Sequence, residues 1–138
     1  MTKMPTDKKV EYMIHELESA IRISKKAIDD WMVRIAEYPE DAIEWGDSPA
    51  KQCVRNSLAT KLLMLINDLL EDGSEKEGES VHELVLREVE KMAMQGLMRC
   101  ARETHNSTSA MSNLTNQLRA EYWAGVVNRF QPRGYGSF

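Results

Sequence analysis

The sequence lacks several features that would point directly to a chemistry. It has only two cysteines, Cys53 and Cys100, and its seven glycines are scattered, so it contains no glycine-rich phosphate loop. Two cysteines do not form a disulfide framework, which favours a reducing cytoplasmic setting. The N-terminal segment has no apolar signal-peptide core, and the longest strongly apolar run, Leu62–Ile66, is far shorter than the ~20 residues of a membrane span. We therefore expect a cytoplasmic protein without membrane contact.

Strand-like alternation of apolar and polar residues is also missing, whereas helical spacing recurs along most of the chain. The 138 residues include 42% hydrophobic and 29% charged residues, which is ordinary for one globular domain. These patterns predict an all-α bundle of three to four helices. We expect a single helical domain over residues 1–130 and a C-terminal tail over residues 131–138, where Pro132, Gly134 and Gly136 oppose a helix.

The first predicted helix begins with Thr6 as its cap and ends before Pro39. Its apolar positions advance in steps of four and three, a coiled-coil-like seam interrupted only by Ser24. The seam consists of Val10, Ile14, Leu17, Ile21, Ser24, Ile28, Trp31, Ile35 and Tyr38. Such a helix is roughly 48 Å long, more than a small core readily covers. Either another helix of similar length or a second copy of the chain must lie along it, and we expect a homo-oligomer, most simply a dimer.

Two further helices have clear start signals. Ser48 followed by Pro49 predicts the start of the second helix, and Gly73 predicts its end. Ser80 with Glu83 three residues later predicts a capping box for the third.

The remainder of the helical region leaves two alternatives open. The heptad-spaced positions fit one long last helix from Ser80 to about Phe130. The poor helix formers around "THNSTSAMSN" equally fit a break near Asn106 to Ser109, followed by a fourth helix from Ala110.

Three groups of residues have the residue types of a catalytic or metal site. Glu11, His15 and Glu18 have i, i+4 and i+7 spacing, which suits either a metal site or a solvated helix flank. The cations that follow on the same side favour the solvated flank. Glu79 with His82 matches a helical metal-ligand spacing only once, whereas a dimetal bundle needs it twice. Cys100 and His105 lie about 140° apart around a helix, which opposes a thiol–imidazole pair and favours Cys100 as a core residue. We expect no catalytic residue, metal or cofactor.

Candidate binding residues gather toward the C-terminal end. A stripe at three-four spacing could bind phosphate or a carboxylate-rich partner, or could simply be a solvated outer face. Its members are Arg99, Arg102, Asn106, Ser109, Asn113 and Asn116. Arginines also alternate with aromatic residues near the tail, which suits stacking on nucleic acid or docking on a neighbouring subunit. These residues are Arg129, Phe130, Arg133, Tyr135 and Phe138, and Arg119 and Trp45 complete the candidate set.

The leading hypothesis from sequence is a non-enzymatic helical interaction protein that self-associates and binds or inhibits a protein partner. The first alternative is binding of nucleic acid or a small anionic nucleotide through Arg99, Arg102, Arg119, Arg129 and Arg133. The second alternative is a metal-dependent helical enzyme. A net charge of −4 is too mild to decide between them.

Overall fold

The computed structural model describes residues 5–40, 48–73, 80–106 and 109–130, and it forms four α-helices. The helices are α1 (Thr6–Glu37), α2 (Ser48–Asp72), α3 (Val81–Asn106) and α4 (Ala110–Phe130). The predicted all-α bundle is confirmed. Of the two alternatives for the C-terminal half, a break with a fourth helix starting at Ala110 is correct, and one continuous helix over residues 80–130 is wrong.

The ends of α1 show where proline acts on the backbone. Pro5 is the residue that precedes the helix, with φ −56° and ψ 147°, and no side chain caps the N-terminus. Thr6 is therefore the first helical residue and not the cap, so that prediction is wrong. The fixed φ of Pro5 already suits the residue before a helix. Tyr38, at φ −135° and ψ 76°, leaves the helical region directly before Pro39, as predicted.

Side chains and one glycine define the other helix ends. The hydroxyl of Ser80 accepts a hydrogen bond from the Glu83 backbone N–H at 3.2 Å, which confirms Ser80 as the cap of α3. At the start of α4, the hydroxyl of Ser109 accepts a hydrogen bond from the Ser112 backbone N–H at 3.4 Å. Gly73 ends α2 with φ +61°, a left-handed conformation that glycine adopts without a steric penalty. Its N–H donates to the Leu69 carbonyl at 3.1 Å.

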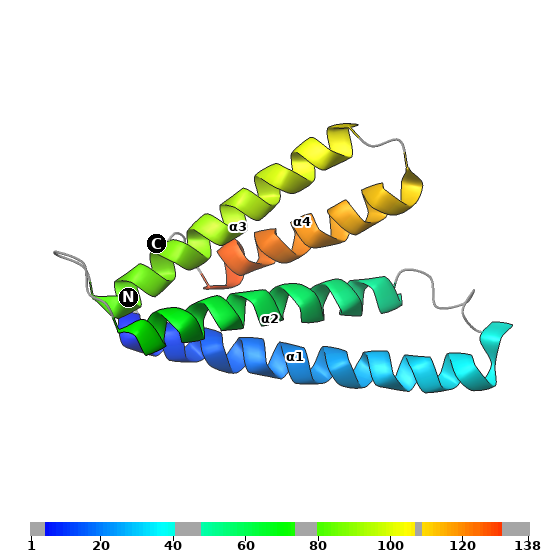
Figure 1. The fold of residues 1–138 in the computed structure, drawn as a ribbon, viewed down its shortest axis with the longest axis horizontal. Helices are drawn as coiled ribbons and strands as arrows, with labels where there is room; N and C mark the ends of the chain where they lie inside the picture. The colour runs from blue at the N-terminus through cyan, green and yellow to red at the C-terminus, as the bar shows by residue number, and fades with distance from the viewer. Residues whose placement is uncertain (1–4, 41–47, 74–79, 107–108, 131–138) are drawn as a thin grey trace.

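The four helices form two antiparallel hairpins (Figure 1). α1 packs along α2, α3 packs along α4, and contacts between the hairpins are fewer and involve mainly α2. The hairpins lie close together near the N-terminus of α1 and diverge toward its C-terminus, where the last turns of α1 project past the other helices (Figure 1). Within the described residues, none of the helices combines the length and apolar character needed to cross a membrane.

The core is one continuous apolar cluster to which all four helices contribute. Its fully enclosed side chains include Met13, Leu17, Leu62, Ile66 and Val89, and Cys100 also lies in it, as predicted. Burial of α1 reaches only as far as Ser24. The seam positions Ile14 and Ile21 are half-buried, and Met13 and Ala20, which the seam did not include, are buried instead. The second helix that the seam requires is α2, which means that the length of α1 alone no longer demands a second copy of the chain.

Candidate functional site

The carboxylate–histidine group near the N-terminus is a solvated flank of α1. Glu11, His15 and Glu18 are all exposed. Glu11 Oε2 forms an ion pair with Lys8 Nζ at 3.4 Å, and both side chains are in solvent. Across the part of the chain that the structure describes, no three His, Cys, Asp or Glu side chains lie close enough together to hold a metal ion. The structure therefore adds no support for the metal-dependent alternative.

The thiol of Cys100 is enclosed and is not activated. Cys100 is buried whereas His105 is exposed, so they belong to different sides of α3. Burial raises the pKa of the Cys100 thiol, and the positive charges of Arg119 and Arg99 oppose this increase without cancelling it. A nucleophilic cysteine needs the opposite shift, toward the thiolate.

The predicted C-terminal stripe is divided between two helices. Arg99, Arg102 and Asn106 are exposed along the last turns of α3, as an outer face requires. Asn113 on α4 is only partly exposed, and its Oδ1 atom is buried with no hydrogen-bond partner among the described residues. Asn116 is buried, so the continuous outer stripe is wrong at this position. The chain reverses between α3 and α4, and the spacing therefore does not carry one face across the break.

The other predicted binding residues are separated in space or lie outside the described residues. Arg119 is exposed on α4, and Arg129 lies near the end of the same helix. Trp45, Arg133 and Tyr135 lie outside the described residues, as does the tail over residues 131–138. The roles assigned to these residues stay predictions.

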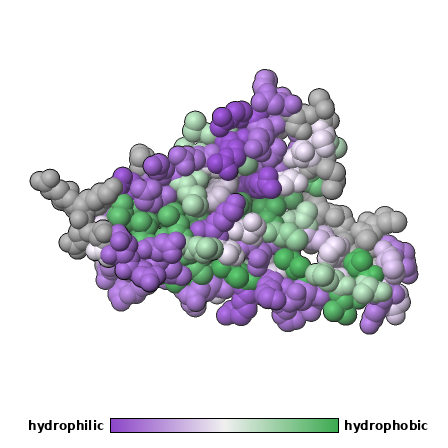
Figure 2. Space-filling model, in the orientation of Figure 1, coloured by the Kyte–Doolittle hydropathy of each residue, from purple (hydrophilic) through white to green (hydrophobic). Residues whose placement is uncertain are grey.

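The projecting end of α1 carries large apolar side chains in solvent. Met32 is 58% exposed, Val33 62% and Tyr38 54%, and we call these three residues the apolar end of α1. Ile28 and Ile35 are half-buried beside them. Figure 2 shows hydrophobic residues gathered where these last turns of α1 lie. Val33 and Tyr38 are five residues apart, about 140° around a helix, so these exposed side chains surround the end of α1 and do not form one face. Large apolar side chains exposed on a monomer surface can mark an interaction site.

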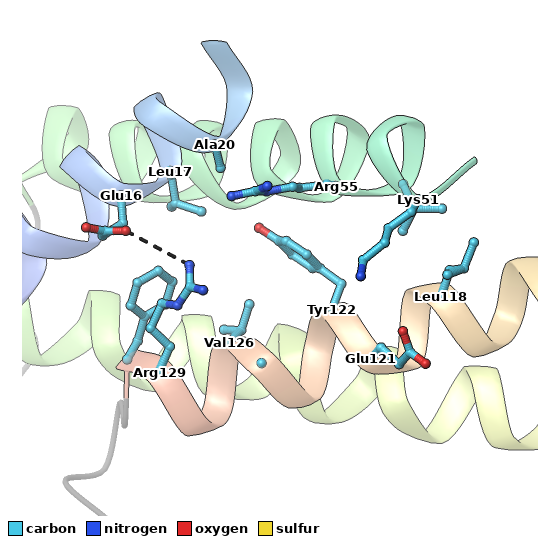
Figure 3. A pocket seen from close by; sticks show the side chains of 13 residues that line it. Glu16, Leu17, Ala20, Lys51, Arg55, Leu118, Glu121, Tyr122, Val126 and Arg129 are labelled. Carbon is cyan, nitrogen blue, oxygen red and sulfur yellow. Dashed lines mark ion pairs between the residues drawn. The ribbon is translucent and has the colours of Figure 1, made fainter. Parts of the chain in front are cut away.

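A cavity of about 380 Å³ lies between the two hairpins, and α1, α2 and α4 line it (Figure 3). We call it the inter-hairpin cavity. Its apolar lining is Leu17, Ala20, Val54, Leu118, Val126 and Phe130. Gly125 also lines it, and a Cβ atom added there would meet no atom within 4 Å. This size and this lining are typical of small-molecule sites.

Polar side chains converge on the same cavity. They are Glu16, Lys51, Arg55, Glu121, Tyr122 and Arg129. Arg129 Nη1 lies 4.0 Å from Glu16 Oε2, a long ion pair that joins α4 to α1 (Figure 3). Glu121 Oε1 accepts a hydrogen bond from Gln117 Nε2 at 3.4 Å. Lys51 and Arg55 form no ion pair with a carboxylate of the described residues.

Tyr122 stands in the middle of these groups, with its hydroxyl pointing toward α2 and Arg55 (Figure 3). Burial raises the pKa of Tyr122 to about 12, although the charges of Arg55 and Arg129 act in the opposite direction. A phenol is neutral at pH 7 even with its ordinary pKa of 10.0, so Tyr122 can donate a hydrogen bond there.

Sequence reasoning missed most of this cavity. Only Arg129 was among the predicted binding residues, whereas Lys51, Arg55 and Tyr122 were not. The i, i+4 spacing of Lys51 and Arg55 was the available signal, but on one helix it resembles ordinary surface charge. Comparison with known proteins finds no matching family model, no matching curated protein and no matching solved structure.

Proposed function

We propose that this chain is a non-enzymatic helical interaction protein that self-associates through the apolar end of α1 and, once assembled, binds a protein partner. The observation that carries the proposal is the exposure of Met32, Val33 and Tyr38 on a helix that buries one face only as far as Ser24. Burying these side chains against another protein would remove apolar surface from water, at about 25 cal/mol per Å².

Charge favours a second copy of the same chain as the occupant. The segment from Lys25 to Tyr38 carries three basic and three acidic residues. Four of these residues form ion pairs within the helix, Lys25 with Asp29 at 3.1 Å and Lys26 with Asp30 at 2.9 Å. An isologous interface brings the same surface of two subunits together, so it requires a surface that does not repel itself. The C-terminal end of α1 meets this requirement, because its positive and negative charges are equal in number and its exposed apolar side chains do not repel one another.

Analytical ultracentrifugation over a range of protein concentrations tests the self-association. The wild type should form a dimer, and Met32→Lys should raise its dissociation constant by about tenfold or more, because a charge at the interface costs over ~1.4 kcal/mol. Met98→Lys is the matched control, since Met98 is 66% exposed on α3 and should leave the dimer unchanged. A wild type that stays monomeric at all concentrations would contradict the proposal.

The protein partner in this proposal is a carboxylate-rich surface that contacts the exposed end of α3. Arg99 and Arg102 present two guanidinium groups there, and guanidinium groups bind carboxylates with paired hydrogen bonds. The proposal places the protein in the cytoplasm, where Cys53 and Cys100 would stay as the free thiols seen in the structure.

One observation favours nucleic acid as the second candidate. Three of the five predicted arginines, Arg99 and Arg102 on α3 and Arg119 on α4, are exposed on the α3–α4 hairpin. Fluorescence anisotropy with a labelled single-stranded oligonucleotide tests this alternative. Binding should weaken steeply with added salt if arginines neutralise phosphates, with a slope of about −0.7 per contact. The leading proposal instead expects no binding at physiological salt.

A further inference from the structure

From the inter-hairpin cavity we infer that this protein binds a small amphipathic monocarboxylate, with the apolar body of the ligand inside the cavity and its carboxylate at Arg55 and Lys51. This inference goes beyond the proposed function and does not depend on self-association. The cavity is formed by three helices of one chain, and the apolar end of α1 contributes nothing to it.

The charge of the cavity argues for an anion. Among the described residues that line the cavity, three are cations, Lys51, Arg55 and Arg129, and two are carboxylates, Glu16 and Glu121. Arg129 is engaged by Glu16, and Glu121 is hydrogen-bonded to Gln117. Lys51 and Arg55 stand one turn apart on α2, and like charges at this spacing destabilise a helix. A bound carboxylate between them would remove this repulsion.

The excess of a single positive charge indicates how much negative charge the ligand carries. A monoanion leaves the cavity neutral, whereas a nucleoside diphosphate or triphosphate would leave it strongly negative. Tyr122 adds beside Arg55 a phenolic hydroxyl that can donate a hydrogen bond. An arginine with a neighbouring neutral donor is a typical arrangement for holding one carboxylate.

The lining and size of the cavity define the rest of the ligand. Apolar side chains in the same lining would contact the body of the ligand. They are Leu17, Val54, Val126 and Phe130. A volume of about 380 Å³ accommodates roughly a dozen water-sized groups. A benzoate with a short alkyl chain or a medium-chain fatty acid has this size, and both combine an apolar body with one carboxylate.

Isothermal titration calorimetry of the full chain with 4-butylbenzoate tests the inference, and 4-butylbenzyl alcohol serves as its uncharged match. We expect the carboxylate to bind at least about tenfold more tightly than the alcohol, because a charged hydrogen bond is involved. Arg55→Met should weaken carboxylate binding by about tenfold and leave alcohol binding unchanged. Arg22→Met is the control, since Arg22 is exposed on α1 and lies outside the cavity.

Gly125 allows the cavity to be filled without disturbing its wall. A Cβ atom at Gly125 would meet no atom within 4 Å, so the backbone there tolerates a larger residue. Gly125→Leu should fold normally, as checked by circular dichroism, and should abolish binding of both compounds. Gly125→Ala should reduce binding only slightly. The inference is overturned if the carboxylate and the alcohol bind equally, if Gly125→Leu binds like the wild type, if adenosine monophosphate binds more tightly than the benzoate, or if no carboxylate binding is detected up to about 1 mM.

Discussion

The side-chain amide of Asn56 donates a hydrogen bond to the hydroxyl of Ser24 at 3.1 Å, within the otherwise apolar contact of α1 with α2. The same amide nitrogen lies 3.2 Å from the Ile21 carbonyl, and the Ser24 hydroxyl donates to that carbonyl at 3.1 Å. Ser24, which interrupts the seam in the sequence, is completely buried. A satisfied polar pair at one seam position fixes the register of two helices, at a cost in stability.

Removing one member of this pair should cost more than removing both. Asn56→Leu should lower the free energy of unfolding by about 1–3 kcal/mol, because it leaves the Ser24 hydroxyl in an apolar contact without its second partner. The double variant Ser24→Ala with Asn56→Leu should recover much of this loss. Urea unfolding followed by circular dichroism measures both. A double variant as unstable as the sum of the two single variants would show that the hydrogen bond does not couple these residues.

The two glycines inside helices should respond to alanine in opposite directions. A Cβ atom at Gly96 would overlap the indole of Trp123, whose Nε1 and Cδ1 atoms lie directly against it, whereas the space beside Gly125 is open. Gly96→Ala should therefore destabilise the protein, by about 1–3 kcal/mol for overpacking, less the ~1 kcal/mol that alanine gains in a helix.

Gly125→Ala is the matched control for this experiment and should stabilise the protein by about 0.5–1 kcal/mol, because only the helix-propensity gain applies. Thermal unfolding of both variants beside the wild type gives the comparison. If Gly96→Ala were as stable as Gly125→Ala, the packing of Trp123 on Gly96 would not restrict the α3–α4 hairpin.

Tyr122 makes stability depend on pH in the alkaline range. Its pKa in the folded protein is about 12, raised from 10.0. Below pH 10 both states hold the proton, so the stabilisation is fully present there. Between pH 10 and 12 the unfolded chain releases the proton first, so stability falls as pH rises, by at most about 1.4 kcal/mol per pH unit for this group.

The variant Tyr122→Phe isolates this contribution from the other groups that titrate at high pH. It should lose less stability than the wild type between pH 10 and 12, as measured by urea unfolding at each pH. Equal losses in the two proteins would mean that the phenol is not held in a buried environment.

The helices were predictable from the sequence because their signals are local. Proline after α1, serine before α3 and glycine after α2 act within one turn of the backbone, and the seam of α1 repeats at every turn. The length of the seam suggested a second copy of the chain, but α2 covers its first half. The apolar end of α1 became visible only when the structure showed which part of the seam stays exposed.

The inter-hairpin cavity could not be predicted in the same way, because its walls come from different hairpins. Arg55 and Tyr122 are far apart in the sequence, and their proximity depends on how the two hairpins diverge. Asn116 was mispredicted for the same reason. Its spacing continues the stripe of α3, but the chain reverses before α4, and Asn116 is buried there. Periodicity indicates which residues share a face of one helix, but it carries no information about the angle between hairpins.

The two cysteines should react with alkylating reagents at very different rates. Cys53 is exposed on α2, whereas Cys100 lies in the core and burial raises the pKa of its thiol. Alkylation requires an accessible thiolate. Cys100 is therefore protected both because it is buried and because its raised pKa leaves a smaller fraction of thiolate. With iodoacetamide at pH 8, mass spectrometry should show rapid modification at Cys53 and slow modification at Cys100.

Cys53→Ser should remove the fast phase, and mild urea should speed the slow phase because it opens the α3–α4 hairpin. Equal rates in the native protein would place Cys100 in contact with solvent and contradict the packing of the core around it.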